Sequence, residues 1–470
     1  MKEKEYKAIN GWLEMETVEH EEVFDFNKDY AKFLDDYRTE REFVKGAIEL
    51  LEAEGYKKLD EFTALKKGDK FYKVNREKAI LAGIVGEKPL EEGLRIVGSH
   101  IDSPRIDLKP TPLYEDSELA YFSTHYYGGI KKYQWVAIPL ALHGVVVKED
   151  GTKVEINIGD KEGDPVFYIS DLLPHLGKDQ MAKKMSEGIT GEQLRLIIGS
   201  IPARNEDGDK DGDKKGAGNK VKSAILDYLH EEYGITEEDL ISCELQIVPA
   251  LKSRDVGFDR GLLAAYGHDD RVCSYTALRA LLDVENPAYT AMVLLMDKEE
   301  IGSMGNTGMQ SHFFENTVAE LVNLTYENYS DLLVRKAIEN SKCLSGDVNA
   351  AFDPNFPEVY DKNNTPYLGK GVVITKYTGA RGKGGSSEAS AEFVAEIRRL
   401  FNNAGVVWQT GELGKVDQGG GGTIAQFLAN YNMDVLDCGP AVLSMHAPYE
   451  VVSKVDVYNT YLAYQVFLEK

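Results

Sequence analysis

The chain has 470 residues, 43% hydrophobic and 28% charged, a balance that predicts two or three globular domains and excludes disorder as its dominant state. A net charge of −24 makes phosphate backbones and anionic lipids poor partners, so we expect neither nucleic acid nor a membrane to bind. The four cysteines form no CxxC pair, and neither a signal peptide nor a membrane-spanning run is evident, which predicts a cytoplasmic protein.

The first hundred residues predict helices and buried strands. Residues 41–54 carry apolar side chains at helical spacing, and Gly55 stands where a helix commonly ends. The apolar runs 78–85 and 94–100 are typical of buried strands.

The middle of the chain has a different pattern. Residues 145–158 predict a β-hairpin around a two-residue Asp150-Gly151 turn, because glycine tolerates a positive φ there. The run WVAIPLAL is also strand-like. Further on, 207–218 resemble the start of a calcium loop, but Gly218 replaces the bidentate glutamate. We therefore predict a solvated surface loop at 205–220.

From about Glu244 the alternation of strands and helices returns. It begins with the strand ELQIV, includes a helix near Phe313–Asn340 and ends in a helix from Asp456. This rhythm is typical of an α/β fold with a mostly parallel sheet flanked by helices. We predict a discontinuous domain formed by 1–105 and 250–470, interrupted by an inserted β-rich domain at 106–249.

Acidic and imidazole side chains recur where apolar runs end. His100 and Asp102 close the run 94–100, and because residues i and i+2 share one side of extended chain, Asp102 can orient His100. Asp269 and Asp270 follow a glycine and precede a helix, where a helix cap is the ordinary alternative.

Three further segments extend this pattern. After the apolar run AMVLLM, a glycine-rich loop carries Asp297, Glu299 and Glu300. Asp347 follows a short apolar run, and His446 follows a late strand. Each alone has an ordinary explanation as a turn, surface or core residue. Together, two imidazoles and three carboxylates at strand ends suit a pair of zinc-like or manganese-like ions, with one further carboxylate free to act as a base.

Five motifs carry a family resemblance along essentially the whole chain. GSHIDSP, GHDDR, DKEEIGS, SGDVNAAFDP and SMHAPYE resemble, in this order, motifs of the M18 metallopeptidases, the aspartyl aminopeptidase family. The resemblance implies a co-catalytic zinc peptidase fold and removal of N-terminal residues from peptides. It further implies two divalent ions per subunit, with zinc as the first choice and manganese or cobalt as alternatives.

The resemblance also implies a role for each residue. Asp269 would bridge the two ions, and Glu299 would be the general base. Asp102 would support His100 from behind, and the metal ligands would be His100, Asp269, Glu300, Asp347 and His446.

One region departs from the aspartyl aminopeptidase pattern. These enzymes carry a lysine followed by an NQRYAS-like stretch that is associated with acidic substrates, whereas this chain has VITKYTGARGKGGSSEAS. Lys376 is either that lysine shifted by one place or has no equivalent there. The side-chain preference therefore stays open, as do two alternative functions: hydrolysis of N-acyl amino acids or other amides, and a catalytically silent binding or scaffold paralogue.

The inserted domain is expected to mediate assembly. Its apolar runs WVAIPLAL and VFYISDLL are more than a small subdomain can cover, which predicts a homodimer. The segment PVFYISDLLPHLGKDQ resembles the M18 dimerisation domain, and the family pattern extends this to a dodecamer built from dimers. By the same resemblance, His175 would act in the neighbouring subunit's active site, although an ordinary surface histidine is an equal alternative.

Overall fold

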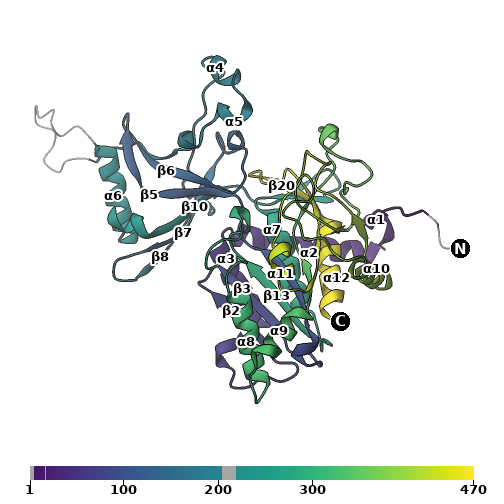
Figure 1. The fold of residues 1–470 in the computed structure, drawn as a ribbon. Coiled ribbons are helices and arrows are strands. Elements are labelled where there is room, and N and C mark those ends of the chain that lie inside the picture. The colour runs from purple at the N-terminus through teal and green to yellow at the C-terminus, as the bar shows by residue number, and fades with distance from the viewer. Residues whose placement is uncertain (1–4, 16, 204–218) are drawn as a thin grey trace, which may run out of the picture. The chain divides into compact units, whose positions relative to one another are not determined.

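The computed structural model describes residues 5–15, 17–203 and 219–470 (Figure 1). The chain divides into two compact units: unit 1 comprises Met1–Ser103, Ser253–Met445 and Glu450–Lys470, and unit 2 comprises Pro104–Lys252 and His446–Tyr449. The calcium-like segment 207–218 lies outside the described residues. None of the described helices combines the length and apolar character needed to cross a membrane.

A nine-stranded mixed sheet forms the centre of unit 1. Its strands are β1 (Lys57–Lys58), β2 (Lys70–Asn75), β3 (Ala79–Ile84), β4 (Leu94–His100), β13 (Thr290–Met296), β14 (Lys342–Ser345), β16 (Val372–Thr375), β17 (Trp408–Thr410) and β18 (Asp434–Gly439). Their order in space is β1-β2-β3-β13-β4-β14-β18-β16-β17. The central strands β13, β4, β14 and β18 run parallel, while β3 and β16 on either side of them are antiparallel to their inner neighbours.

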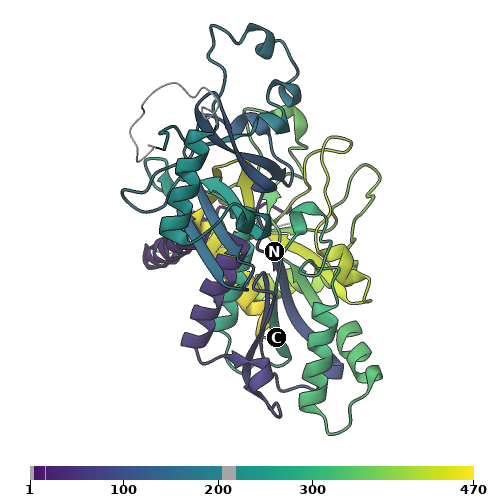
Figure 2. The ribbon, with the colours of Figure 1, turned by 90° about the vertical axis from the view of Figure 1, so that its left-hand side faces the viewer.

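Helices cover both faces of this sheet, as the sequence predicts (Figure 2). One face packs against α2 (Thr17–Asp36), α3 (Glu40–Ala53), α7 (His268–Leu282), α10 (Ala391–Ala404) and α12 (Lys454–Leu468). The other packs against α8 (Phe313–Thr325), α9 (Asp331–Glu339) and α11 (Ala425–Ala429). Along β13, Val293 and Leu295 join the first core, whereas Met292 and Leu294 join the second. Burial on both faces explains why this strand is a continuous apolar run.

Local signals place two helix ends in unit 1. Helix α3 ends before Gly55, whose φ of +80° is the left-handed conformation predicted there. The single helix expected near Phe313–Asn340 is wrong, because two helices occupy this range. The Ser330 side chain accepts a hydrogen bond from the Leu332 main-chain N–H and so starts α9 as a new helix.

A smaller sheet in unit 1 pairs strands that precede α7 with strands near the end of the chain. It has the order β11-β12-β20-β19-β15. Its strands are β11 (Arg254–Val256), β12 (Leu262–Ala265), β15 (Asn349–Ala350), β19 (Ala441–Leu443) and β20 (Glu450–Ser453). Antiparallel pairing of β12 with β20 sets Ala265 opposite Glu450. The short helix α1 (Gly11–Glu14) completes the helices of this unit.

Unit 2 is built on a six-stranded antiparallel sheet of the order β8-β7-β10-β5-β6-β9. Its elements are β5 (Arg105–Asp116), β6 (Leu119–Tyr127), β7 (Leu140–Val147), β8 (Lys153–Ile158), β9 (Leu196–Gly199), β10 (Cys243–Pro249), and the helices α4 (Lys178–Met181), α5 (Met185–Gly188) and α6 (Lys220–Tyr233). The assignment of the ELQIV strand to the returning α/β rhythm is wrong, because that run is part of β10. It pairs with β7 and β5 instead.

The predicted β7–β8 hairpin is confirmed, but its turn is longer than expected. Lys148 and Thr152 are joined by a main-chain hydrogen bond across three residues, and Gly151 has a φ of +84°. This is a tight turn followed by one left-handed residue, the usual construction of a three-residue hairpin loop. The two-residue Asp150-Gly151 turn is therefore wrong, although the glycine has the predicted backbone conformation.

Candidate metal centre

The predicted ligands of unit 1 converge at the carboxyl edge of the central parallel strands. His100 is the last residue of β4, Asp347 lies two residues beyond β14, and Glu299 and Glu300 occupy the short 3-10 turn η6 (Glu299–Ile301) after β13. Asp269 comes from the start of α7. Because β13, β4 and β14 are adjacent and parallel, their carboxyl ends deliver these side chains to one edge of the sheet.

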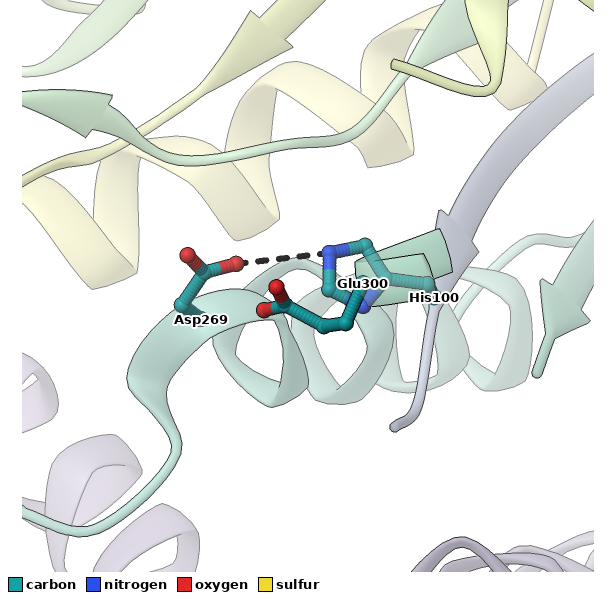
Figure 3. Close-up of side chains that lie close together, drawn as sticks. All are labelled: His100, Asp269 and Glu300. Atoms are coloured by element: carbon teal, nitrogen blue, oxygen red, sulfur yellow. Dashed lines mark ion pairs between the residues drawn. The ribbon is translucent and has the colours of Figure 1, made fainter. Parts of the chain in front are cut away.

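The side chains form two overlapping groups that could each hold a metal ion. One contains His100, Asp269 and Glu300, the other His100, Glu299 and Asp347, and within each group the ligand atoms lie within 4.8 Å of one another. His100 Nε2 lies 3.3 Å from Asp269 Oδ1 and 3.8 Å from Glu299 Oε2. Figure 3 shows the imidazole and the Asp269 and Glu300 carboxylates close together.

Asp102 connects two parts of this site. Its main-chain oxygen lies 3.0 Å from His100 Nδ1, closer than its carboxylate Oδ1 at 3.4 Å. The carboxylate accepts hydrogen bonds from the Glu299 and Glu300 main-chain N–H groups, at 3.1 and 3.2 Å. Asp102 thus lies beside the imidazole, and its side chain also fixes the turn carrying Glu299 and Glu300.

The electrostatics of the cluster favour a bound cation. Burial alone would lower the pKa of His100, but hydrogen bonds to Asp102 and Asp269 outweigh it and raise that pKa well above its usual value. Burial and the charge of Asp270 raise the pKa of Asp347 well above its usual value. One imidazole and four carboxylates share this space. Divalent ions would compensate that negative charge, and imidazole–carboxylate donors suit zinc, so the residues fit the expected group.

Two residues that hold Asp269 in place, and one that binds the turn before it, were not singled out from the sequence. The Asp269 N–H donates to Glu450 Oε2 at 3.0 Å, and Ser103 Oγ donates to the Asp269 main-chain oxygen at 2.7 Å. Buried Arg271 donates to the Gly267 main-chain oxygen at 3.2 Å. Glu450 lies in SMHAPYE, Ser103 in GSHIDSP and Arg271 in GHDDR. Their place in a motif beside a predicted ligand was the sequence signal that could have identified them.

Besides Asp102, three predicted residues lie outside the two ligand groups. His446 groups with unit 2, where its Nδ1 lies 2.8 Å from the Gly129 main-chain oxygen. His175 is exposed in unit 2, between β8 and β9, and Lys376 is exposed directly after β16. Their functional roles stay predictions.

A mixed α/β sheet that carries an imidazole–carboxylate cluster at its carboxyl edge is typical of metal-dependent hydrolases. The family model described as aminopeptidase I zinc metalloprotease (M18) matches residues 33–468, and the chain belongs to this M18 family. The resemblance stated from the five motifs is confirmed, and with it a metal-dependent aminopeptidase activity.

Relatives and solved structures match this chain over nearly its full length. A probable M18 family aminopeptidase 1 from Clostridium acetobutylicum is 52% identical over 469 residues, covering 99% of this chain and 98% of the relative. The crystal structure of an M18 aminopeptidase from Thermotoga maritima has a TM-score of 0.93 at 48% identity, covering 99% of this chain and 100% of that one. A structure described as the S. cerevisiae mApe1 dodecamer has a TM-score of 0.75 at 25% identity, covering 94% and 96%.

Proposed function

We propose that the chain is a dinuclear aminopeptidase in which two divalent ions are held at the carboxyl edge of the nine-stranded sheet. The observation that carries this proposal is the pair of overlapping ligand groups around His100. The proposed ligands are His100, Asp269, Glu300, Asp347 and His446, with Asp269 as the bridge. Zinc is the first choice because the matching family is described as a zinc metalloprotease.

Glu299 is the proposed general base. Bound ions would supply an activated water and polarise the scissile carbonyl. The Glu299 carboxylate would take the water's proton and return it to the leaving amine, which requires a carboxylate within hydrogen-bond reach of the reacting atoms. Its main-chain N–H is held by Asp102 at 3.1 Å, so the backbone of this residue is fixed.

The substrate is a peptide with a free N-terminal amine, without a specified side chain. Lys376 is exposed directly after β16, and its role in a preference for acidic residues stays a prediction. Hydrolysis of N-acyl amino acids by the same residues is the competing activity, and it differs in needing no free amine. A panel of aminoacyl-naphthylamides set against N-acetylated amino acids separates the two.

Assembly through unit 2 is also part of the proposal. The segment between β8 and β9 exposes apolar side chains: Val166 (52%), Leu172 (46%), Leu173 (48%), Leu176 (67%), Met181 (70%) and Met185 (67%). Exposed apolar clusters commonly mark protein interfaces. The likeness to a structure described as a yeast dodecamer supports assembly into a dodecamer. The build-up from dimers and the reach of His175 into the neighbouring subunit's site are carried by the family resemblance alone. The cytoplasmic location expected from the sequence stays a prediction.

Sedimentation of two variants tests the assembly. Leu176→Asp places a charge within the exposed apolar segment and should yield smaller species, whereas His175→Ala should keep the assembly and lose turnover. Full-size particles of Leu176→Asp would contradict an interface at this segment. Unchanged turnover of His175→Ala would remove only the shared-site role.

The central experiment combines metal analysis with the substrate panel. Purified chain should contain two divalent ions and release N-terminal residues from aminoacyl-naphthylamides. Cleavage of N-acetylated substrates alone would refute the aminopeptidase assignment. One ion per fully active chain would refute the dinuclear proposal.

A further inference from the structure

Glu450 is a buried carboxylate directly behind the predicted bridging ligand. It is 1% exposed and is the first residue of β20, where it pairs with Ala265 of β12. Its Oε2 accepts the Asp269 main-chain N–H at 3.0 Å. This contact joins positions 181 residues apart in the sequence. No ligand role is predicted for Glu450, and it is absent from both ligand groups.

The backbone of Asp269 is held on both of its sides. Glu450 accepts its N–H, and Ser103 Oγ donates to its carbonyl oxygen at 2.7 Å. Asp269 itself is only 4% exposed, so water cannot readily replace either partner. A buried N–H that loses its acceptor is unfavourable, and the chain would shift to recover one. Such a shift would displace the carboxylate that approaches His100 Nε2.

From this arrangement we propose that Glu450 is a positioning residue for the metal centre. By accepting the Asp269 N–H, it fixes the backbone from which the bridging carboxylate extends. This inference rests on the proposed function, because it takes Asp269 to be a metal ligand. Outer partners that orient metal ligands commonly contribute about 10–100-fold to metal affinity.

Two substitutions separate hydrogen bonding from packing. Glu450→Gln keeps an acceptor oxygen at nearly the same volume, whereas Glu450→Met fills the space with no acceptor for the Asp269 N–H. Each full-length apo-protein is titrated calorimetrically with Zn²⁺ in a competing chelator. Co²⁺ is added in parallel, because its visible absorption reports the coordination geometry.

A matched control comes from another buried carboxylate. Asp456, in the first turn of α12, accepts main-chain N–H bonds from Gly369 and Gly371, both at 2.7 Å. These glycines precede β16 and lie outside all five quoted motifs. Asp456→Asn and Asp456→Leu therefore measure what loss of a buried, hydrogen-bonded carboxylate does to metal binding through stability alone. Thermal melting of every apo-variant reports that stability.

The expected result is a loss of about 10–100-fold in Zn²⁺ affinity, with an altered Co²⁺ spectrum, for Glu450→Met only. Glu450→Gln should bind within about threefold of the wild type, well below that range of loss, and both Asp456 variants should bind like the wild type. Wild-type affinity and spectrum in Glu450→Met would overturn the proposal, as would equal losses in Glu450→Gln or the Asp456 variants. The number of ions in the wild type decides the dinuclear proposal separately, because the variants are compared for whichever ions it holds.

Discussion

His100 and His268, two buried histidines near Asp269, show how neighbouring groups decide the protonation state of a buried imidazole. His100 is 1% exposed and His268 is 0% exposed, so burial disfavours the charged form of both. Among carboxylates, the pKa of His100 is raised well above its usual value. His268 lies 2.9 Å from the Tyr30 hydroxyl and 3.2 Å from the Leu263 main-chain oxygen, and burial lowers its pKa to about 3.

The difference between the two pKa values shows which of the two histidines needs a partner beyond the side chains around it. His268 as a neutral imidazole accepts from Tyr30 and donates to Leu263, so its hydrogen bonding is complete within the chain. His100 instead shares its surroundings with an excess of carboxylates, an arrangement that a divalent cation stabilises. The following predictions test this contrast.

The largest effect is expected for Asp269→Ala. If the Asp269 carboxylate bridges two ions as proposed, removing it should empty the pair and abolish activity together with metal content. Metal analysis of the purified variant measures this, with the exposed Asp434→Ala as the control that should keep both. Two tightly held ions in Asp269→Ala would contradict the bridging role.

Glu299→Gln should separate chemistry from metal binding. Loss of a general base lowers turnover by about 10²–10⁴-fold, while the ligands of the ions remain. Steady-state kinetics on metal-replete protein measures the loss. Glu300→Gln, its neighbour, is the matched variant and should lose metal instead. Near-normal turnover of Glu299→Gln would remove this residue from the mechanism.

Lowering the pH should destabilise the fold because buried His268 then has to take up a proton. Its folded-state pKa of about 3 lies below the unfolded value, so the unfolded state binds more protons as the pH falls. The stability conferred by the neutral form is present above pH ~6.5 and is lost as the pH falls towards 3, by up to roughly 4 kcal/mol.

Denaturant unfolding at several pH values compares the wild type with His268→Gln, whose side chain does not titrate. The difference in unfolding free energy between the two should shrink or change sign as the pH falls from 7 to 4. A constant difference across this range would show that His268 is not held neutral by the fold.

The smallest effect is expected for Tyr30→Phe. It removes the hydroxyl that donates to His268 and should cost about 1–2 kcal/mol of unfolding free energy, the usual penalty for an unsatisfied buried acceptor. Metal content and turnover should not change. Tyr458→Phe, which loses an exposed hydrogen bond to Glu22, is the control and should cost less.

Features set by neighbouring residues could be predicted from the sequence. The strand at 94–100, the end of α3 at Gly55 and the carboxylates at strand ends all follow from local pattern and were found. The sheet to which ELQIV belongs could not be predicted, because a buried strand has the same apolar pattern in either sheet. The contact between Glu450 and Asp269 was missed for a related reason, since it depends on the pairing of β20 with β12.

The most direct test of the central claim is a crystal structure of the wild-type chain grown with zinc and measured at the zinc absorption edge. The account predicts two anomalous peaks bridged by the Asp269 carboxylate, one of them about 2.0–2.1 Å from a nitrogen of His100. A single peak, or two peaks without Asp269 between them, would contradict it.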